Sequence, residues 1–263
     1  MKKNALFILF VLACLTHAHS QVATDTAQTP STQGDTAMAA RIIDNYLGYL
    51  NFDHLLKDSI LSVVSYVVDR SHPNDTITIY RWYAANRQSR IEMWQNNRME
   101  DAYFSNGKGI FRRFTSGRRE WSDLTQISYY DLTSALDIRG ALYEWRSKGS
   151  EPSYMGEYEY NGHPVYRVFV TSPEIYDRNY FFEKETGLLF ILTEEDHLFG
   201  DSKPAANAHR VDWRAWHEFT PFHGCLLPSI ESYQIQGQIV VIHHYYKLEA
   251  YNKKLFTEAY RRK

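Results

Sequence analysis

Apart from one interruption, the sequence from Ser59 to Tyr251 is a succession of short runs rich in β-branched and aromatic residues, separated by polar turns. Residues of these types fit the pleated, half-buried surface of a β-sheet. The connections are short and contain turn residues, as in Asn106-Gly107-Lys108, Asn161-Gly162 and Gln236-Gly237. Such turns join antiparallel neighbours, because a parallel neighbour would need a crossover of about a dozen residues. The pattern therefore predicts a mainly β protein built on an antiparallel sheet.

The runs give the bounds of the expected strands. We predict strands over Ser59 to Asp69, Thr76 to Ala85, Ser89 to Trp94, Glu100 to Phe104, Gly109 to Phe114, Arg119 to Asp123, Tyr154 to Tyr160, Pro164 to Thr171, Asn179 to Glu183, Leu188 to Thr193, Arg210 to Thr220, Ser229 to Gln234 and Ile239 to Tyr251. Two segments have helical spacing instead. Apolar residues recur every three or four positions from Ala39 to Leu50, which predicts an amphipathic helix. The interruption from Tyr130 to Ser147 is rich in apolar residues with few breakers, and we expect one or two helices there.

The N-terminus has the three-part layout of a secretory signal peptide. Lys2 and Lys3 precede an apolar run from Ala5 to Leu15, and small residues around Ala18-His19-Ser20 follow. The run is too short to cross a bilayer, which takes about 20 apolar residues. We expect cleavage after Ser20, a flexible tether over residues 21–38 and a single domain over residues 39–263. Cys14 ends a segment that loosely resembles a lipobox, so lipidation there stays open as an alternative.

Charge and cysteine content narrow the possible partners. The chain has a net charge of -2, and cleavage after Ser20 removes Lys2 and Lys3, which leaves -4. This balance gives no support to a nucleic-acid partner. Cys225 is the only cysteine that remains after cleavage, so no intramolecular disulfide can form. No catalytic signature surrounds Cys225, and we expect it to be a buried apolar residue.

Catalytic or metal-binding residues are weakly indicated. His217, Glu218 and His223 lack the spacing of a zinc-binding helix, and the acidic run Glu194 to His197 lacks a calcium-loop pattern. His243 and His244 would point to opposite faces of a strand, and Glu157 and Glu159 are typical of surface charge. No nucleophile elbow, phosphate-binding loop or redox motif is present. We therefore expect no enzyme, no metal and no cofactor.

The order of the elements and several short phrases resemble the superfamily of outer-membrane lipoprotein carriers and receptors (LolA, LolB and LppX-like proteins). The phrases are Gln88 to Glu92 (QSRIE), Ser105 to Gly109 (SNGKG), Tyr158 to Val170 (YEYNGHPVYRVFV), Tyr180 to Leu189 (YFFEKETGLL) and Phe222 to Ser229 (FHGCLLPS). The resemblance covers roughly residues 39–257. It departs from the family at Ala85-Asn86, where the carrier has a basic residue beside a proline that holds its lid. The lipoprotein-release mechanism is therefore not carried over.

The resemblance implies a strongly curved, half-open, barrel-like antiparallel sheet, with helices that cap its concave face. The capping elements would be Ala39 to Leu50 and Tyr130 to Ser147. An apolar face that no second sheet covers needs another apolar partner, so the resemblance implies a cavity for acyl chains or other apolar cargo. The candidate cavity residues are those on apolar alternations: Ile77, Ile79, Ile91, Met93, Tyr166, Val168, Val170, Tyr180, Phe182, Val240, Ile242 and Tyr246. The same pattern also fits an ordinary packed core, and both interpretations stay open.

These expectations describe a monomeric periplasmic carrier or chaperone that binds a lipid, an acyl chain or a lipid-modified protein, with an envelope protein as a possible partner. Lipidation at Cys14 would anchor it to the membrane instead. A structural or interaction module of the cell envelope with a filled interior is an alternative. A hydrolase built on the same sheet is a less favoured one.

Overall fold

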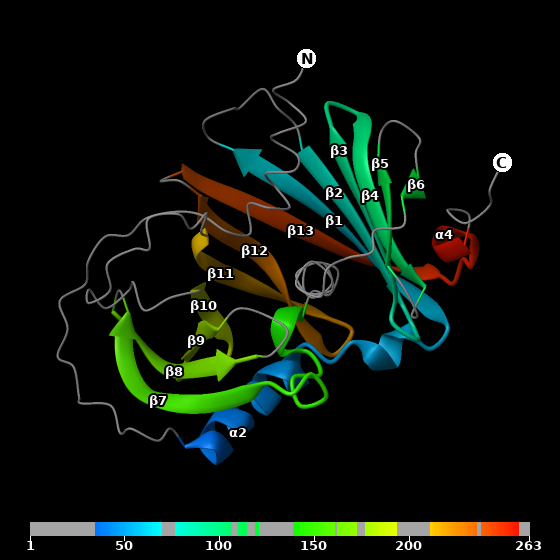
Figure 1. Cartoon of the computed structure of the whole chain (residues 1–263). Helices are drawn as coiled ribbons and strands as arrows, with labels where there is room; N and C mark the ends of the chain where they lie inside the picture. The colour runs from blue at the N-terminus through cyan, green and yellow to red at the C-terminus, as the bar shows by residue number, and fades with distance from the viewer. Residues whose placement is uncertain are drawn as a thin grey trace. The chain divides into compact units, whose positions relative to one another are not determined.

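The computed structural model of the chain describes residues 35–69, 77–106, 110–114, 119–120, 139–160, 162–172, 177–193, 211–235 and 238–257. The expected signal peptide, its cleavage site, Cys14 and nearly all of the expected tether lie outside these residues. Thirteen strands form one sheet in the order β6-β5-β4-β3-β2-β1-β13-β12-β11-β10-β9-β8-β7 (Figure 1). The pairings from β1 through β6 and from β7 through β11 are antiparallel. The prediction of a mainly β protein with an antiparallel sheet is confirmed.

Each predicted strand is present, with small differences at the ends. The strands are β1 (Ser59–Asp69), β2 (Ile77–Ala84), β3 (Gln88–Gln95), β4 (Arg98–Asn106), β5 (Ile110–Phe114), β6 (Arg119–Glu120), β7 (Glu151–Tyr160), β8 (His163–Thr171), β9 (Arg178–Glu183), β10 (Leu189–Thr193), β11 (Val211–Phe222), β12 (Cys225–Ile235) and β13 (Gln238–Ala250). The largest described difference is at β12, which begins at Cys225 instead of Ser229. His223 and Gly224 both have positive φ, 49° and 86°, so a two-residue turn already reverses the chain before Cys225.

The helical segments differ more from expectation. Helix α2 spans Thr36–Tyr49 and begins before the predicted start at Ala39. The reason is Asp35, whose Oδ1 accepts a hydrogen bond from the Met38 amide at 2.9 Å and so caps the first turn.

The helices expected over Tyr130 to Ser147 are wrong in their described part. Residues 139–147 contain only the 3-10 helix η2 (Gly140–Leu142) and turns, and Gly140 has a φ of 66°, which an α-helix does not accept. The rest of that segment lies outside the described residues. A second 3-10 helix, η1 (Asp53–Leu56), and the short helix α4 (Lys254–Thr257) were not predicted.

The chain divides into two compact units, which we describe separately. Unit 1 contains residues 1–49, 144–219 and 231–240, and unit 2 contains residues 50–143, 220–230 and 241–263. The residues of β11, β12 and β13 are therefore shared between the units. That residues 39–263 form a single domain stays a prediction.

In unit 2, the register of β1 to β4 gives the sheet two different faces. Odd-numbered residues of β1 and β2 share one face, because Val63 pairs with Arg81 and Ser65 pairs with Ile79. Residues on this face are mostly buried. On the other face Tyr66 and Val68 are exposed, and Tyr80 stacks on Trp82 with 5.9 Å between ring centroids. The C-terminal helix α4 packs on that other face, where Phe256 joins Ile60 and Ala84 in a small core.

In unit 1, apolar residues cover both faces of the sheet. On one face Val165, Phe181, Ile191 and Ala215 form a core cluster, with Tyr158, Tyr160, Phe190 and Trp213 packed against it. Helix α2 packs against the opposite face, where the Tyr46 ring meets the Phe182 ring edge-on at 5.6 Å. The tight turn between β7 and β8 agrees with the predicted hairpin, since Tyr160 pairs with His163 and Gly162 has a φ of 81°.

Candidate ligand-binding face

The predicted cavity residues of β2 and β3 lie together on one sheet face of unit 2. Ile79 pairs with Met93 and Ile77 with Gln95, so the predicted residues of both strands point to the same side. We call this side the Ile91 face; it comprises Leu61, Val63, Ser65, Val67, Ile77, Ile79, Arg81, Tyr83, Ser89, Ile91, Met93, Gln95, Asp101, Tyr103, Ile242, His244 and Tyr246. Ile77, Ile79, Ile91 and Met93 are each only 4–5% exposed. These four residues thus share one face, as their alternation in the sequence indicates, and their role in lining a cavity stays a prediction.

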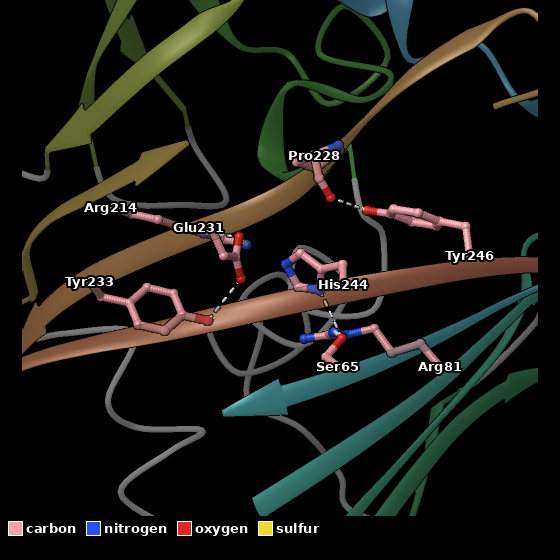
Figure 2. A network of polar contacts seen from close by, with 8 residues as sticks. All are labelled: Ser65, Arg81, Arg214, Pro228, Glu231, Tyr233, His244 and Tyr246. Atoms are coloured by element: carbon pink, nitrogen blue, oxygen red, sulfur yellow. Dashed lines mark hydrogen bonds and ion pairs between the residues drawn. The ribbon is translucent and has the colours of Figure 1, made fainter. Parts of the chain in front are cut away.

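Three polar residues interrupt the Ile91 face and bond to one another. Arg81 Nη1 donates to Ser65 Oγ at 2.6 Å, and Ser65 Oγ lies 2.8 Å from His244 Nδ1 (Figure 2). An arginine can only donate, so Ser65 accepts from Arg81 and its own O–H can donate to a neutral His244. Ser65 is fully buried and His244 nearly so, while Arg81 is half-buried. We call these residues the Arg81 cluster; they come from β1, β2 and β13.

Other polar groups on the Ile91 face are held by near neighbours in unit 2. Asp101 Oδ2 accepts from the Tyr103 hydroxyl at 3.0 Å, and its Oδ1 accepts from the Ala102 amide at 2.9 Å. The Tyr246 hydroxyl donates to the main-chain oxygen of Pro228 (Figure 2). Tyr246 is half-buried, whereas Ile242 is 1% exposed.

The predicted cavity residues of unit 1 also share a face. Tyr166 pairs with Phe182 and Val168 with Tyr180, so these residues and Val170 point to one side, which we call the Val168 face. Val168 and Phe182 are fully buried, and Tyr46 of α2 packs on Phe182. Helix α2 therefore packs on this face within unit 1. That it caps a concave face around a cavity stays a prediction. Val240 also belongs to unit 1 and is half-buried.

A buried ion pair lies on the Val168 face. Tyr180 pairs with Leu192, and Leu192 pairs with Arg214, which places Arg214 on that side. Its Nε and Nη2 both donate to Glu231 Oε2, at 3.0 and 2.5 Å, and the Tyr233 hydroxyl donates to Glu231 Oε1 at 2.9 Å (Figure 2). Burial opposes the charge of Arg214, but the carboxylate of Glu231 and the neighbouring hydroxyls of Tyr233 and Tyr46 together outweigh burial and raise the pKa of the guanidinium. Sequence reasoning missed this pair.

Helix α2 is also held by an ion pair at its exposed side. Arg146 donates to both carboxylate oxygens of Asp44, at 2.7 and 2.6 Å, and the Trp145 indole donates to Asp44 at 3.4 Å. The hydrogen bond from Arg146 lowers the pKa of Asp44 below its usual 3.8. In unit 2, Arg139 donates to Asp53 at 2.9 Å and stacks over the Tyr143 ring. Both segments that the sequence named as capping elements thus have specific anchors.

The residues considered for chemistry do not converge. His217 Nε2 contacts Ser232 Oγ at 2.6 Å, whereas His223 contributes its main-chain oxygen to a contact with His54. Glu157 pairs with Lys184 at the surface. Within the described part of the chain, no group of three or more His, Cys, Asp or Glu side chains could hold a metal ion. The acidic run Glu194 to His197 lies outside the described residues.

Cys225 is buried, as expected, and its thiol donates to the main-chain oxygen of Asn51 at 3.1 Å. Burial raises the pKa of this thiol, which makes it a poor nucleophile. Among the described helices, none has the length and apolar character that crossing a bilayer demands.

Three solved structures are similar to this chain in overall fold. The first is a LolA superfamily protein from Nitrosomonas europaea (TM-score 0.55, 12% identity, 85% of this chain and 99% of that one). The second is a DUF1329 family protein from Desulfovibrio piger (TM-score 0.52, 11% identity, 85% of this chain and 99% of that one). The third is a domain described as an outer membrane lipoprotein-sorting protein from Vibrio parahaemolyticus (TM-score 0.54, 7% identity, 85% of this chain and 98% of that one). None of the three is named as an enzyme.

The chain therefore shares its fold with a LolA superfamily protein, and the predicted likeness in fold is confirmed. The strong curvature of the sheet and the capping of a concave face stay predictions. No protein-family profile matches the chain, and no curated protein matches it in sequence. At these identities the likeness establishes the fold alone.

Proposed function

We propose that the protein is an extracytoplasmic carrier or chaperone that binds a lipid, an acyl chain or a lipid-modified protein on the Ile91 and Val168 faces. The observation that carries this proposal is the common orientation of the predicted apolar residues: Ile77, Ile79, Ile91 and Met93 are neighbours on one side of the sheet in unit 2 and form an apolar patch there. Contact with an acyl chain would bring about 0.8 kcal/mol per methylene removed from water. The fold shared with a lipoprotein-sorting domain is consistent with such cargo.

We further propose that the sheet curves around its cargo as a half-open barrel. Register shifts occur between Met93 and Trp94, between Tyr154 and Gly156, and between Leu189 and Ile191. Irregularities of this kind bend the strand that carries them and increase its twist. Figure 1 draws β7, which contains one of them, as a strongly bent ribbon. Bending of this kind supports a concave apolar face.

The N-terminal segment supports a location outside the cytoplasm. Lys2 and Lys3 followed by an apolar run favour export, and we propose the periplasm as the destination, with Cys14 as a possible anchor. A carrier of apolar cargo in the periplasm must receive the cargo from one partner and deliver it to another. We therefore propose an envelope protein as a transient partner.

A filled interior is the competing interpretation, and two observations favour it. Phe182 is fully buried under Tyr46, and the apolar residues of the Ile91 face are only 4–5% exposed. A protein whose faces are permanently packed would be an interaction module of the envelope rather than a carrier. Measurements of ligand affinity distinguish a carrier from an interaction module with a filled interior.

The test is a titration of delipidated protein with a fluorescent fatty acid. Ile91→Asp and Val168→Asp place a charge on the two faces, and we expect each to weaken binding at least tenfold. The matched control is Val68→Asp, because Val68 is 46% exposed and lies on the other side of β1. Circular dichroism checks that each variant is folded; Ile91→Phe and Val168→Phe, which fill space without charge, replace any variant that is not. Equal affinity for wild type and folded face variants would overturn the proposal.

A further inference from the structure

Arg81 differs from Arg90 and Arg139, the other arginines of unit 2 whose side chains are described and not exposed. Arg90 pairs with Glu92, and Arg139 pairs with Asp53 at 2.9 Å. Arg81 has no such partner: among the described residues its hydrogen bond goes to the neutral hydroxyl of Ser65, and no carboxylate lies within ion-pair distance. An arginine side chain carries a positive charge in proteins.

The surroundings of Arg81 are apolar. Its register partners are Val63 on β1 and Ile91 on β3, and Ile79 precedes it on the same side of β2. Val63 is fully buried, and Ile79 and Ile91 are each 4% exposed. A cation held beside apolar side chains loses part of its hydration, and only an opposite charge or further hydrogen bonds compensate for that loss.

The one carboxylate on the Ile91 face does not supply this compensation. Asp101 is 3% exposed and its two oxygens accept from the Ala102 amide and the Tyr103 hydroxyl. It lies on β4, beside Met93 rather than beside Arg81. In unit 1, by contrast, the Val168 face neutralises its arginine, because Arg214 pairs with Glu231.

The Arg81 cluster also orients the guanidinium. Ser65 is fully buried and accepts one N–H of Arg81, while His244 fixes the Ser65 hydroxyl from the other side (Figure 2). An arginine has five N–H donors in a planar fork that matches a carboxylate or a phosphate. One hydrogen bond fixes the fork and leaves other donors for an anion.

We infer that Arg81 binds the anionic end of the ligand, and that the ligand is an amphiphile whose apolar chain lies along Ile77, Ile79, Ile91 and Met93. The shared chemistry is a terminal carboxylate or phosphate on an alkyl chain. This inference rests on the proposed function and names its ligand class. A hydrogen bond to a charged partner is worth about 1.5–3 kcal/mol, which corresponds to roughly 10- to 150-fold in affinity.

The experiment compares dodecanoate, dodecyl phosphate and dodecanol as ligands of the delipidated full-length mature protein, by calorimetry at pH 8. Wild type should bind at least one of the two anions roughly 10-fold or more tightly than the alcohol. Tighter binding of dodecanoate would indicate a fatty acid, and tighter binding of dodecyl phosphate would indicate a phospholipid headgroup. Arg81→Gln should remove this preference and change the affinity for dodecanol less than threefold. Arg81→Lys keeps the charge without the fork and should retain part of the preference. Arg90→Gln, on the opposite face, is the control and should behave as wild type.

The outcomes separate this inference from the proposed function. If all three ligands bind wild type with equal affinity, the role of Arg81 is overturned and the carrier function stands. If none of the three ligands binds wild type, both the role of Arg81 and the proposed carrier function are overturned. The comparison within wild type needs no substitution, so instability of Arg81→Gln would not leave the inference untested.

Discussion

Removal of the negative charge of Glu231 should destabilise unit 1 strongly. The Glu231 side chain is 1% exposed and its carboxylate receives two hydrogen bonds from Arg214 and one from Tyr233. Glu231→Gln preserves the shape of the side chain and leaves Arg214 without a counter-ion.

The magnitude follows from the burial of the two partners. Breaking a fully buried ion pair costs about 3–5 kcal/mol, because the remaining charge is left uncompensated. The Arg214 side chain is 23% exposed, so water recovers part of that cost, and we expect a loss of about 2–4 kcal/mol. For a domain of this size, such a loss lowers Tm by roughly 5–15 °C.

The assay is urea unfolding of wild type, Glu231→Gln and the double variant Glu231→Leu with Arg214→Met. The double variant should recover most of the loss, since it removes both charges. Glu157→Gln is the matched control: Glu157 pairs with Lys184, but its side chain is 54% exposed, so the loss should stay below about 1 kcal/mol. If Glu231→Gln costs no more than Glu157→Gln, or if the double variant is no more stable than Glu231→Gln, the reasoning is refuted.

Two further predictions concern single groups. Because the hydrogen bond from Arg146 lowers the pKa of Asp44, this pair contributes stability above the ordinary Asp pKa of 3.8 and loses it as the pH falls through the lowered value. Carboxyl NMR shifts should therefore show the Asp44 titration moving up in Arg146→Gln, and an unchanged midpoint would contradict this. Burial of the Cys225 thiol predicts that a disulfide reagent modifies native protein far more slowly than protein in denaturant. Equal modification rates in native and denatured protein would contradict the burial of Cys225.

The strands were predictable because their apolar residues alternate with period two and their turns carry distinctive residues. The same alternation predicted which side chains share a face: Ile77, Ile79, Ile91 and Met93 were correctly grouped. Helix α2 was placed correctly except for its start, because the capping role of Asp35 becomes visible only with the Met38 amide in place. The helices expected near Tyr143 did not appear in the described residues, since apolar content alone does not overcome the turn at Gly140.

The Arg81 cluster could not be predicted as a unit, because Ser65 and His244 are 179 residues apart in sequence. A signal was nevertheless present. Ser65 interrupts the alternation of Val63 and Val67, and Arg81 continues the alternation of Ile77 and Ile79 with a charge. Polar residues at apolar positions of neighbouring strands indicate a functional site or a compensated polar pair. The Arg214 and Glu231 pair was missed for a different reason: β12 was predicted to begin at Ser229 instead of Cys225, so the short turn that joins β11 to β12 was not recognised.

The most direct test of an acyl chain on the Ile91 face is an intermolecular NOE measurement between an alkyl ligand and isoleucine methyl groups of delipidated protein. We predict NOEs from the chain methylenes to Ile77, Ile79 and Ile91. None should reach Ile60, which is equally buried but packs with Phe256 on the other side of the sheet. Saturating ligand with no NOE to any of the three methyls, or with NOEs to Ile60 instead, would contradict the account.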